Sequence, residues 1–277
     1  MVFLGLTRPS PASRRVATDY GASRGFNYEH VGASRHQPHH SPAPIPTQSE
    51  RTEKTDGISN PDLSGGQRGG GGSGGWRVPA VPYATDRNFA RVGTGKEDFV
   101  AARGFMSRWG HFQLGWSEVD ATTGTARGDD VCVCANVLGV WIRNPLQVVY
   151  NDGGEGAGVG AGKGQKRHGS GGGGGGEGAE CKERFSFAHG CLDGHLLAGE
   201  ESFVLERRAD DSVWYGVQTF SRPAHPLAFL GYPAVRLLQW RFARDSMRAV
   251  QRGVEEARGG GGGGGGAGGG AGGIRRG

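Results

Sequence analysis

The sequence predicts an α+β fold in which a curved antiparallel sheet of about six to seven strands packs against a long C-terminal helix. Three observations predict this class. Apolar residues recur at three- and four-residue spacing in two segments, one at each end of the periodic region. Between these segments, runs of alternating apolar and polar residues are separated by short polar turns, as in an antiparallel meander. The glycine tracts lie outside these runs, so the periodic pattern is that of one domain.

Glycine content divides the chain into parts that can fold and parts that cannot. The 277 residues include 56 glycines, concentrated at 65–75, 153–178 and 259–273. Such tracts bury little apolar surface and lose much backbone entropy on ordering, so we expect them to stay flexible. The predicted organisation is a flexible N-terminal tail at 1–25, a docking segment at 26–36, a disordered insert at 37–80, a single α+β domain at 81–258 with a disordered Gly-rich insert at 152–180, and a disordered Gly-rich tail at 259–277.

The first elements of the domain follow from local signals. A short strand at 88–92 precedes a helix that starts at Thr94 or Gly95. Glu97 and Asp98 fall in its first turn, where the helix dipole favours acidic side chains. The alternating runs that follow lie at 112–116, 131–136, 145–150, 184–189, 202–207 and 212–220.

The last predicted element is a helix that runs from near Ala234 to the glycine tail at Gly259. Val235, Leu238 and Phe242 lie on one stripe of it, which favours packing against a sheet. The order of strand, helix, six strands and long helix is that of helix-grip or START-like folds. These folds leave an apolar cavity between sheet and helix, so we expect a small apolar or amphipathic ligand as the partner.

Charge and hydropathy restrict the other partners. Much of the net charge of +5 lies in the tails and inserts, where it favours solubility over a defined nucleic-acid site. The glycine tracts lack both the phosphate-loop motif and the Arg-Gly-Gly repeats of RNA-binding tails. No stretch reaches the roughly 20 apolar residues of a membrane span. We therefore expect a soluble intracellular protein, in the cytoplasm by default with organelle targeting as an alternative, without a membrane or nucleic-acid partner; the oligomeric state stays open.

Cysteine spacing argues against a metal site. Four cysteines are too few for a secreted disulfide scaffold, so reduced thiols are expected. Cys132 and Cys134 share one strand face, but a zinc site would need two more ligands at suitable spacing. We interpret them as small buried hydrophobes, and we expect neither a metal nor a cofactor.

The best candidate site is the polar group formed by His189, His195, Glu200 and Glu201. A histidine beside a carboxylate can act as a general base or contact a ligand. Adjacent strand residues point to opposite faces, so at most one of the two glutamates faces a pocket. For His195 we favour a hydrogen-bonded role in supporting its loop, with ligand contact and catalysis as the alternatives.

Arg222 and His225 follow the last predicted strand and extend this candidate ligand-binding set. Arg222 can bind an anionic group or pair with Glu200 or Glu201, and we favour the ion pair. The aromatic residues of the strands add two further candidates, Trp116 and Tyr215.

Three function hypotheses follow. The first is a module that binds a small ligand between sheet and helix. The second is an enzyme that uses His195 with Glu200 or Glu201 and Arg222. The third is a scaffold whose Gly-rich arms carry the interaction.

Several motifs are recognisable as a set, the most specific being Gly194-His-Leu-Leu-Ala-Gly-Glu-Glu201-Ser-Phe203 and Thr219-Phe-Ser-Arg-Pro-Ala-His225. Val92-Gly-Thr-Gly95, Trp109-Gly-His-Phe112 and Pro145-Leu-Gln-Val-Val-Tyr150 belong to the same set. Through them the chain resembles the UPF0548 family of uncharacterised plant and bacterial proteins, which carry the DUF1990 domain. The resemblance implies a fold and a relationship, and it supplies no activity.

Overall fold

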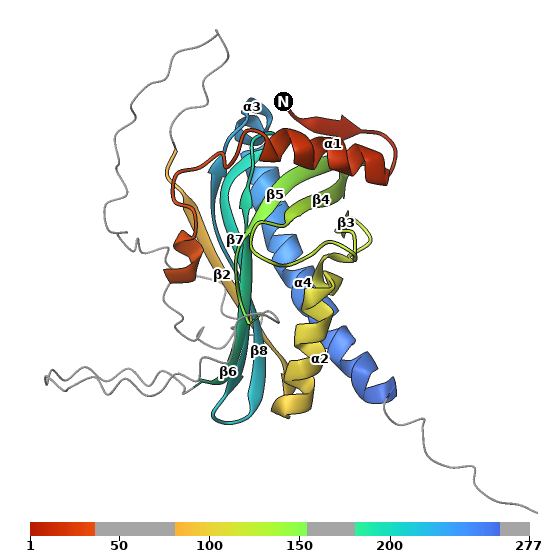
Figure 1. Ribbon diagram of the computed structural model, residues 1–277, viewed down its shortest axis with the longest axis vertical. Helices are drawn as coiled ribbons and strands as arrows, with labels where there is room; N and C mark the ends of the chain where they lie inside the picture. The colour runs from red at the N-terminus through yellow and green to blue at the C-terminus, as the bar shows by residue number, and fades with distance from the viewer. Residues whose placement is uncertain (37–80, 154–180, 261–277) are drawn as a thin grey trace, which may run out of the picture.

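The computed structural model describes residues 1–36, 81–153 and 181–260 (Figure 1), and the statements below concern these residues. The helices are α1 (Pro11–Ala22), α2 (Gly95–Ser107), α3 (Pro226–Leu230) and α4 (Tyr232–Gly260), with short 3-10 turns at Ala33–His36 and Gly110–Phe112. The strands are β1 (Phe3–Gly5), β2 (Ala84–Thr94), β3 (Ser117–Glu118), β4 (Asp130–Val137), β5 (Val140–Asp152), β6 (Cys181–Cys191), β7 (Leu197–Arg208) and β8 (Ser212–Pro223). The insert predicted at 37–80, and most of those predicted at 152–180 and 259–277, lie outside the described residues.

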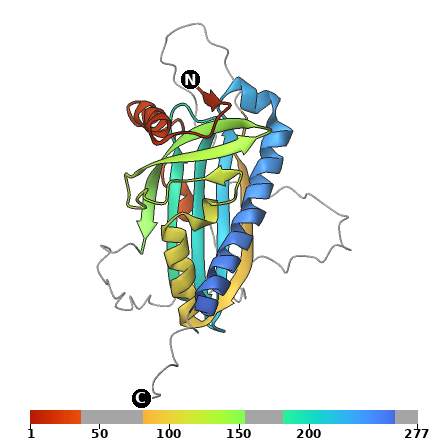
Figure 2. The same ribbon diagram turned by 90° about the vertical axis from the view of Figure 1, so that its right-hand side faces the viewer.

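One curved antiparallel sheet forms the frame of the domain. Its strand order is β2-β8-β7-β6-β5-β4-β3, and β1 pairs with the first part of β5, beyond the end of β6. The helices α2 and α4 lie along one face of the sheet (Figure 2). The predicted α+β meander with a long terminal helix is therefore confirmed, as is the helix-grip arrangement.

The core lies between the sheet and the helices α2 and α4. Its largest fully buried side chains include Trp109, Phe187 and Phe203, whose rings pack edge to face or tilted against one another. The ring of Phe242 on α4 contacts the same group. Burying rings of this size makes the largest contribution to core stability, and it fixes α4 against the sheet.

The flexible tail predicted at 1–25 is wrong, because β1 and α1 are both ordered there. Ser10 caps α1 by accepting a hydrogen bond from the backbone of Ser13, and Pro11 occupies the first helical position. Ala17 is fully buried in a cluster with two strand cysteines. The burial that stabilises α1 thus comes from β4 and β5, which are distant in sequence.

The strand predicted at 112–116 is also wrong. Trp109 adopts a left-handed conformation with φ of 58°, and a 3-10 turn follows at Gly110–Phe112. Leu114 then donates a backbone hydrogen bond to Ser117, which closes a further turn. The alternating aromatic residues of this stretch reach the interior from turns, so their spacing imitates that of a strand.

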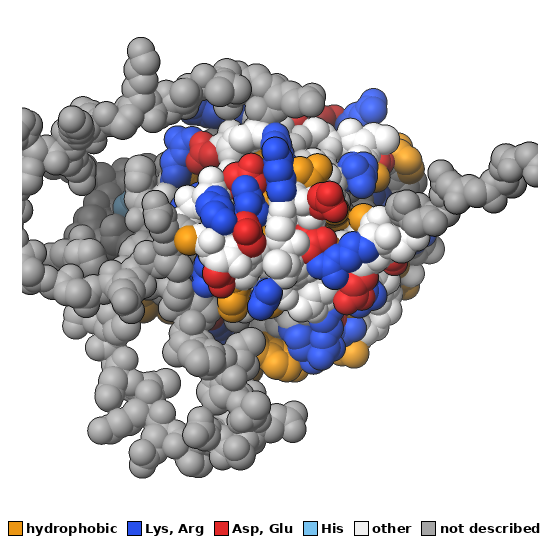
Figure 3. All heavy atoms as spheres, turned by 90° about the horizontal axis from the view of Figure 1, so that it is seen from below, with side chains coloured by type: hydrophobic (Ala, Val, Ile, Leu, Met, Phe, Trp, Pro, Cys, Tyr) orange, Lys and Arg blue, Asp and Glu red, His pale blue; other side chains and the backbone are white. Residues whose placement is uncertain are grey.

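Cysteine exposure and surface charge agree with a globular domain. Cys132 and Cys134 are buried as predicted, with 3.8 Å between their sulfur atoms, and Cys181 is exposed. Side chains of both charges are interspersed on the face seen in Figure 3. Within the described ranges, no helix combines the length and the apolar character needed to cross a membrane.

Candidate functional site

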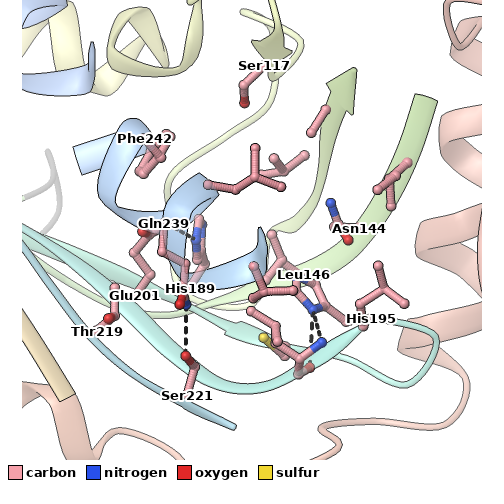
Figure 4. A pocket seen from close by; sticks show the side chains of 18 of the residues that line it. Ser117, Asn144, Leu146, His189, His195, Glu201, Thr219, Ser221, Gln239 and Phe242 are labelled. Carbon is pink, nitrogen blue, oxygen red and sulfur yellow. Dashed lines mark hydrogen bonds and ion pairs between the residues drawn. The ribbon is translucent and has the colours of Figure 1, made fainter. Parts of the chain in front are cut away.

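A cavity of about 200 Å³ lies between the sheet and the N-terminal half of α4. Most of its walls are apolar, with contributions from Phe112, Trp116, Val133, Leu146, Leu238 and Phe242. Several of these side chains are half-buried, which places the opening beside β4 and α4. Apart from Ser117, the polar side chains labelled in Figure 4 gather at two separate ends of the cavity.

One polar end is built by four strands in register. His189 of β6 lies opposite Glu201 of β7, which lies opposite Thr219 of β8, which lies opposite Asp86 of β2. We call these four residues the polar row. The inward positions one step further from the cavity on β6, β7 and β8 are apolar and buried, namely Phe187, Phe203 and Val217. On β6, β7 and β8 the change from apolar core residues to the polar row therefore occurs at the same position across the sheet.

His189 and Glu201 form the first contact of the polar row. Nε2 of His189 lies 3.2 Å from Oε2 of Glu201. A carboxylate can only accept, so the imidazole N–H is the donor. The ring of His189 also stacks on Trp109, with 6.1 Å between ring centres and an interplanar angle of 10°. These two contacts fix the orientation of the imidazole.

The other half of the polar row ties α4 to the sheet. Arg236 of α4 donates two hydrogen bonds of 2.6 Å to the carboxylate of Asp86. Arg236 also donates to Gln239, whose amide donates to Ser221 of β8 at 2.9 Å. Thr219 adds a longer hydrogen bond of 3.4 Å to Asp86. The positive charge of Arg236 is thereby neutralised by Asp86, and Arg236 does not line this cavity.

Glu201 has no such cationic partner. Its side chain is 23% exposed, and His189 is its only ion-pair or hydrogen-bond partner among the described residues. No Lys or Arg is among the described residues that line the cavity. Likewise, no three His, Cys, Asp or Glu side chains within the described ranges come close enough to hold a metal ion. The cavity thus holds one carboxylate, Glu201, that is not paired with a Lys or Arg side chain among the described residues.

His195 lies at the other end of the cavity, near Asn144 (Figure 4). The backbone N–H of Leu197 donates to its Nδ1 at 2.9 Å, so His195 supports its loop as we favoured. Burial and the nearby His189 lower the pKa of His195 to about 3. The imidazole is therefore neutral at physiological pH.

The backbone geometry at position 199, near the start of β7, requires a glycine. Its φ is +138°, which L side chains rarely adopt, and a Cβ there would lie 2.0 Å from the carbonyl oxygen of Phe220. This close approach of β7 to β8 lies at the wall of the cavity, near Glu201.

Glu200 points to the opposite face of the sheet from Glu201, as predicted. Its carboxylate accepts hydrogen bonds from the Tyr28 hydroxyl at 2.8 Å, from the Ser34 backbone at 3.0 Å, and from the backbone of Gly32. Burial and the charge of Glu200 raise the pKa of Tyr28. Glu200 therefore holds residues 26–36 against the outer face, and its carboxylate does not enter the cavity.

Arg222 and His225 do not join the site. The guanidinium of Arg222 lies 4.9 Å from the ring centre of Tyr83, and the ion pair we favoured with Glu200 or Glu201 is absent from the ion pairs of the described residues. Arg222 occupies an outward position of β8, and Glu201 points inward. His225 caps α3 by accepting a hydrogen bond of 3.2 Å from Leu227.

Of the two aromatic candidates, only Trp116 lies at the cavity. Trp116 lines the cavity, and its indole N–H donates to Asp245 of α4 at 3.1 Å. Tyr215 is fully buried in the packed core, with its hydroxyl 2.7 Å from that of Ser246. Tyr215 points to the correct face of β8, but it lies two inward positions beyond Thr219, where no cavity remains.

Sequence reasoning missed several polar residues of the cavity. Thr219 and Ser221 lie within a recognised motif, and Gln239 and Asn144 carried no signal of their own. The missed signal was a change along β8, whose inward positions run from apolar residues to two hydroxyl residues. A similar change on neighbouring strands marks the level at which a core gives way to a site.

Known proteins resemble the chain over most of its described length. The family model described as "Domain of unknown function (DUF1990)" matches residues 72–249. A UPF0548 protein of Arabidopsis thaliana is 37% identical over 169 residues, which cover 60% of this chain and 72% of that protein. A UPF0548 protein of Dictyostelium discoideum is 28% identical over 180 residues, covering 62% and 73% respectively.

Solved structures give weaker matches. The protein TTHA0849 of Thermus thermophilus aligns with a TM-score of 0.39 and 9% identity, over 64% of this chain and 99% of that one. The ginseng major latex-like protein 151 of Panax ginseng aligns with a TM-score of 0.31 and 9% identity, over 62% and 97%. Similarities of this size add nothing to the assignment of a function.

Proposed function

Because the chain belongs to the DUF1990 family, whose description names no activity, we propose a function from the cavity itself: the protein binds a small, mainly apolar ligand between the sheet and α4. The observation that carries this proposal is a cavity of about 200 Å³ with mainly apolar walls, beside a core packed with aromatic rings.

The apolar walls of the open cavity support this proposal. Protein interiors are close-packed, and voids larger than a water molecule are few. Because this cavity opens beside β4 and α4, its apolar walls are exposed to solvent in the free protein. A ligand that covers these walls would remove apolar surface from water, which is favourable.

The volume and the walls define the ligand class. An apolar cavity of about 150 Å³ is large enough for benzene, so this one suits a single ring with a short substituent. The apolar walls would hold the ring, and the polar row would contact the substituent. A ligand of about ten heavy atoms would bind with a dissociation constant of roughly micromolar to millimolar.

The enzymatic alternative loses support from the geometry. It required His195, a glutamate and Arg222 in one site. Only His195 and Glu201 offer their side chains to the cavity, and they lie at opposite ends of it (Figure 4). The arms of the scaffold hypothesis lie outside the described residues.

Filling the cavity tests the proposal. Ala135 lines the cavity from β4, so Ala135→Leu would place three extra carbons in it. Ala234→Leu makes the same change at an exposed position of α4 and is the matched control. Benzyl alcohol, titrated by calorimetry or NMR, is expected to bind the wild type and Ala234→Leu equally, and Ala135→Leu at least tenfold more weakly. No binding by the wild type, or equal binding by all three proteins, would contradict the proposal.

A further inference from the structure

The charge of the cavity is unbalanced at one end. Glu201 faces the apolar space, and the carboxylate of its neighbour Glu200 is bound on the other face of the sheet. The side chain of Glu201 is 23% exposed and has no Lys or Arg partner among the described residues. A carboxylate in this position is unfavourable unless its hydrogen bonds or a bound group compensate the lost water. The carboxylate of Glu201 therefore favours a ligand that carries a positive charge.

A second, smaller cavity meets the first one at Glu201. Its volume is about 140 Å³, and it shares Glu201, Thr219 and Gln239 with the main cavity. Its other charged walls are Asp86 and Arg236, which neutralise each other through two hydrogen bonds. Among the inward Asp, Glu, Lys and Arg side chains of the two cavities, Glu201 is therefore the one without a partner of opposite charge from this set, and it lies where the cavities join.

The free hydrogen-bonding groups of Glu201 and Thr219 at this junction are acceptors. His189 occupies Oε2 of Glu201, and Oε1 has no hydrogen-bond partner within the described part of the chain. The Thr219 hydroxyl donates to Asp86, so its lone pairs are left to accept. Gln239 donates one N–H to Ser221 and accepts from Arg236, and its second N–H remains as a donor. A group that donates several hydrogen bonds would match this arrangement.

We propose that the cavity selects a small apolar amine, whose protonated ammonium group binds Glu201 and Thr219 while its apolar body lies against the walls of the main cavity. This inference rests on the proposed ligand-binding function. An ammonium group supplies both the missing positive charge and several N–H donors. A carboxylate ligand would instead meet Glu201 with a like charge and no donor to offer.

Three one-ring probes separate this inference from the proposed function. Benzylammonium, benzyl alcohol and benzoate share the ring and differ in charge. A hydrogen bond to a charged group contributes about 1.5–3 kcal/mol, which corresponds to roughly tenfold to a hundredfold in affinity. The wild type is therefore expected to bind benzylammonium at least tenfold more tightly than benzyl alcohol, and benzoate most weakly.

Glu201→Gln keeps an acceptor for His189 and removes only the charge. This variant is expected to lose the preference for benzylammonium and to keep its affinity for benzyl alcohol. Glu256→Gln, at an exposed position of α4, is the matched control and should keep the wild-type order. Binding of benzyl alcohol without any preference for benzylammonium, or a preference that survives in Glu201→Gln, overturns the inference and leaves the proposed function standing. Failure of all three probes overturns both.

Discussion

Nε2 of His189 lies 3.2 Å from Oε2 of Glu201, and the two residues face each other directly across β6 and β7. The contact stands where the inner face of the sheet changes from packed aromatic rings to an open cavity. On the opposite face of β7, Glu200 accepts hydrogen bonds from residues of the segment 26–36. Two adjacent glutamates thus have separate roles, one toward a ligand and one toward the fold.

Glu200→Ala should loosen residues 26–36. The substitution leaves the Tyr28 hydroxyl and the backbone N–H groups of Gly32 and Ser34 without their acceptor. Because hydrogen bonds to a charged group contribute about 1.5–3 kcal/mol, we expect a loss of about 3 kcal/mol or more in the free energy of unfolding. Denaturant unfolding gives that loss, and hydrogen exchange should show new opening confined to 26–36. Equal losses for Glu200→Ala and Glu201→Gln would contradict the separation of roles.

His195 should make stability depend on pH. Its folded-state pKa of about 3 is below the value of about 6.5 expected in the unfolded chain. The unfolded state therefore binds the proton first as the pH falls, so the contribution of neutral His195 is complete above about pH 6.5 and is lost toward pH 3. The fully buried His111 also has a lowered pKa, caused mainly by burial, and it acts in the same direction.

His195→Asn isolates this contribution, because the Asn carbonyl can still accept from Leu197. Urea unfolding between pH 4 and 6 should show a slope of stability against pH that is smaller by about 1.4 kcal/mol per unit. An unchanged slope would show that His195 is protonated in the folded protein.

Gly199→Ala should destabilise the wall of the cavity near Glu201. The positive φ alone costs about 1–3 kcal/mol for a residue with a Cβ, and the contact with Phe220 would force β7 and β8 apart. Gly104→Ala on α2 is the control of opposite sign, since an added Cβ meets nothing closer than 3.5 Å there. We expect that control to raise stability by up to about 1 kcal/mol. Thermal unfolding of the two variants compares these effects, and a neutral Gly199→Ala would contradict the assigned geometry.

The fold was predictable where periodicity reflects burial. The strands β4 to β8 alternate because one face packs on α2 and α4, and the stripe of α4 matches that face. The N-terminal elements were missed because α1 has only a short apolar side, with Ala17 and Gly21 buried. Its stability comes from contacts with strands that are distant in sequence, and local helix propensity does not reflect such contacts. The strand predicted at 112–116 was wrong because the residues form turns there, and the apolar side chains of these turns happen to recur at every second position.

The candidate site was predictable in part. Alternation correctly placed Glu200 and Glu201 on opposite faces. It could not say which face held the cavity, because that depends on where α4 crosses the sheet. Arg222 and Tyr215 were misplaced for the same reason: the first lies on the outer face, and the second lies at a depth where the core is full. The register that joins His189, Glu201 and Thr219 emerges only when the three strands are paired.

The most direct test of the central claim is an NMR measurement of contacts between benzyl alcohol and the wild-type protein. We predict intermolecular NOEs from the ring protons to the methyl groups of Val133, Leu146 and Leu238, which line the cavity from β4, β5 and α4. NOEs only to residues outside this cavity, or none at ligand saturation, would contradict the claim.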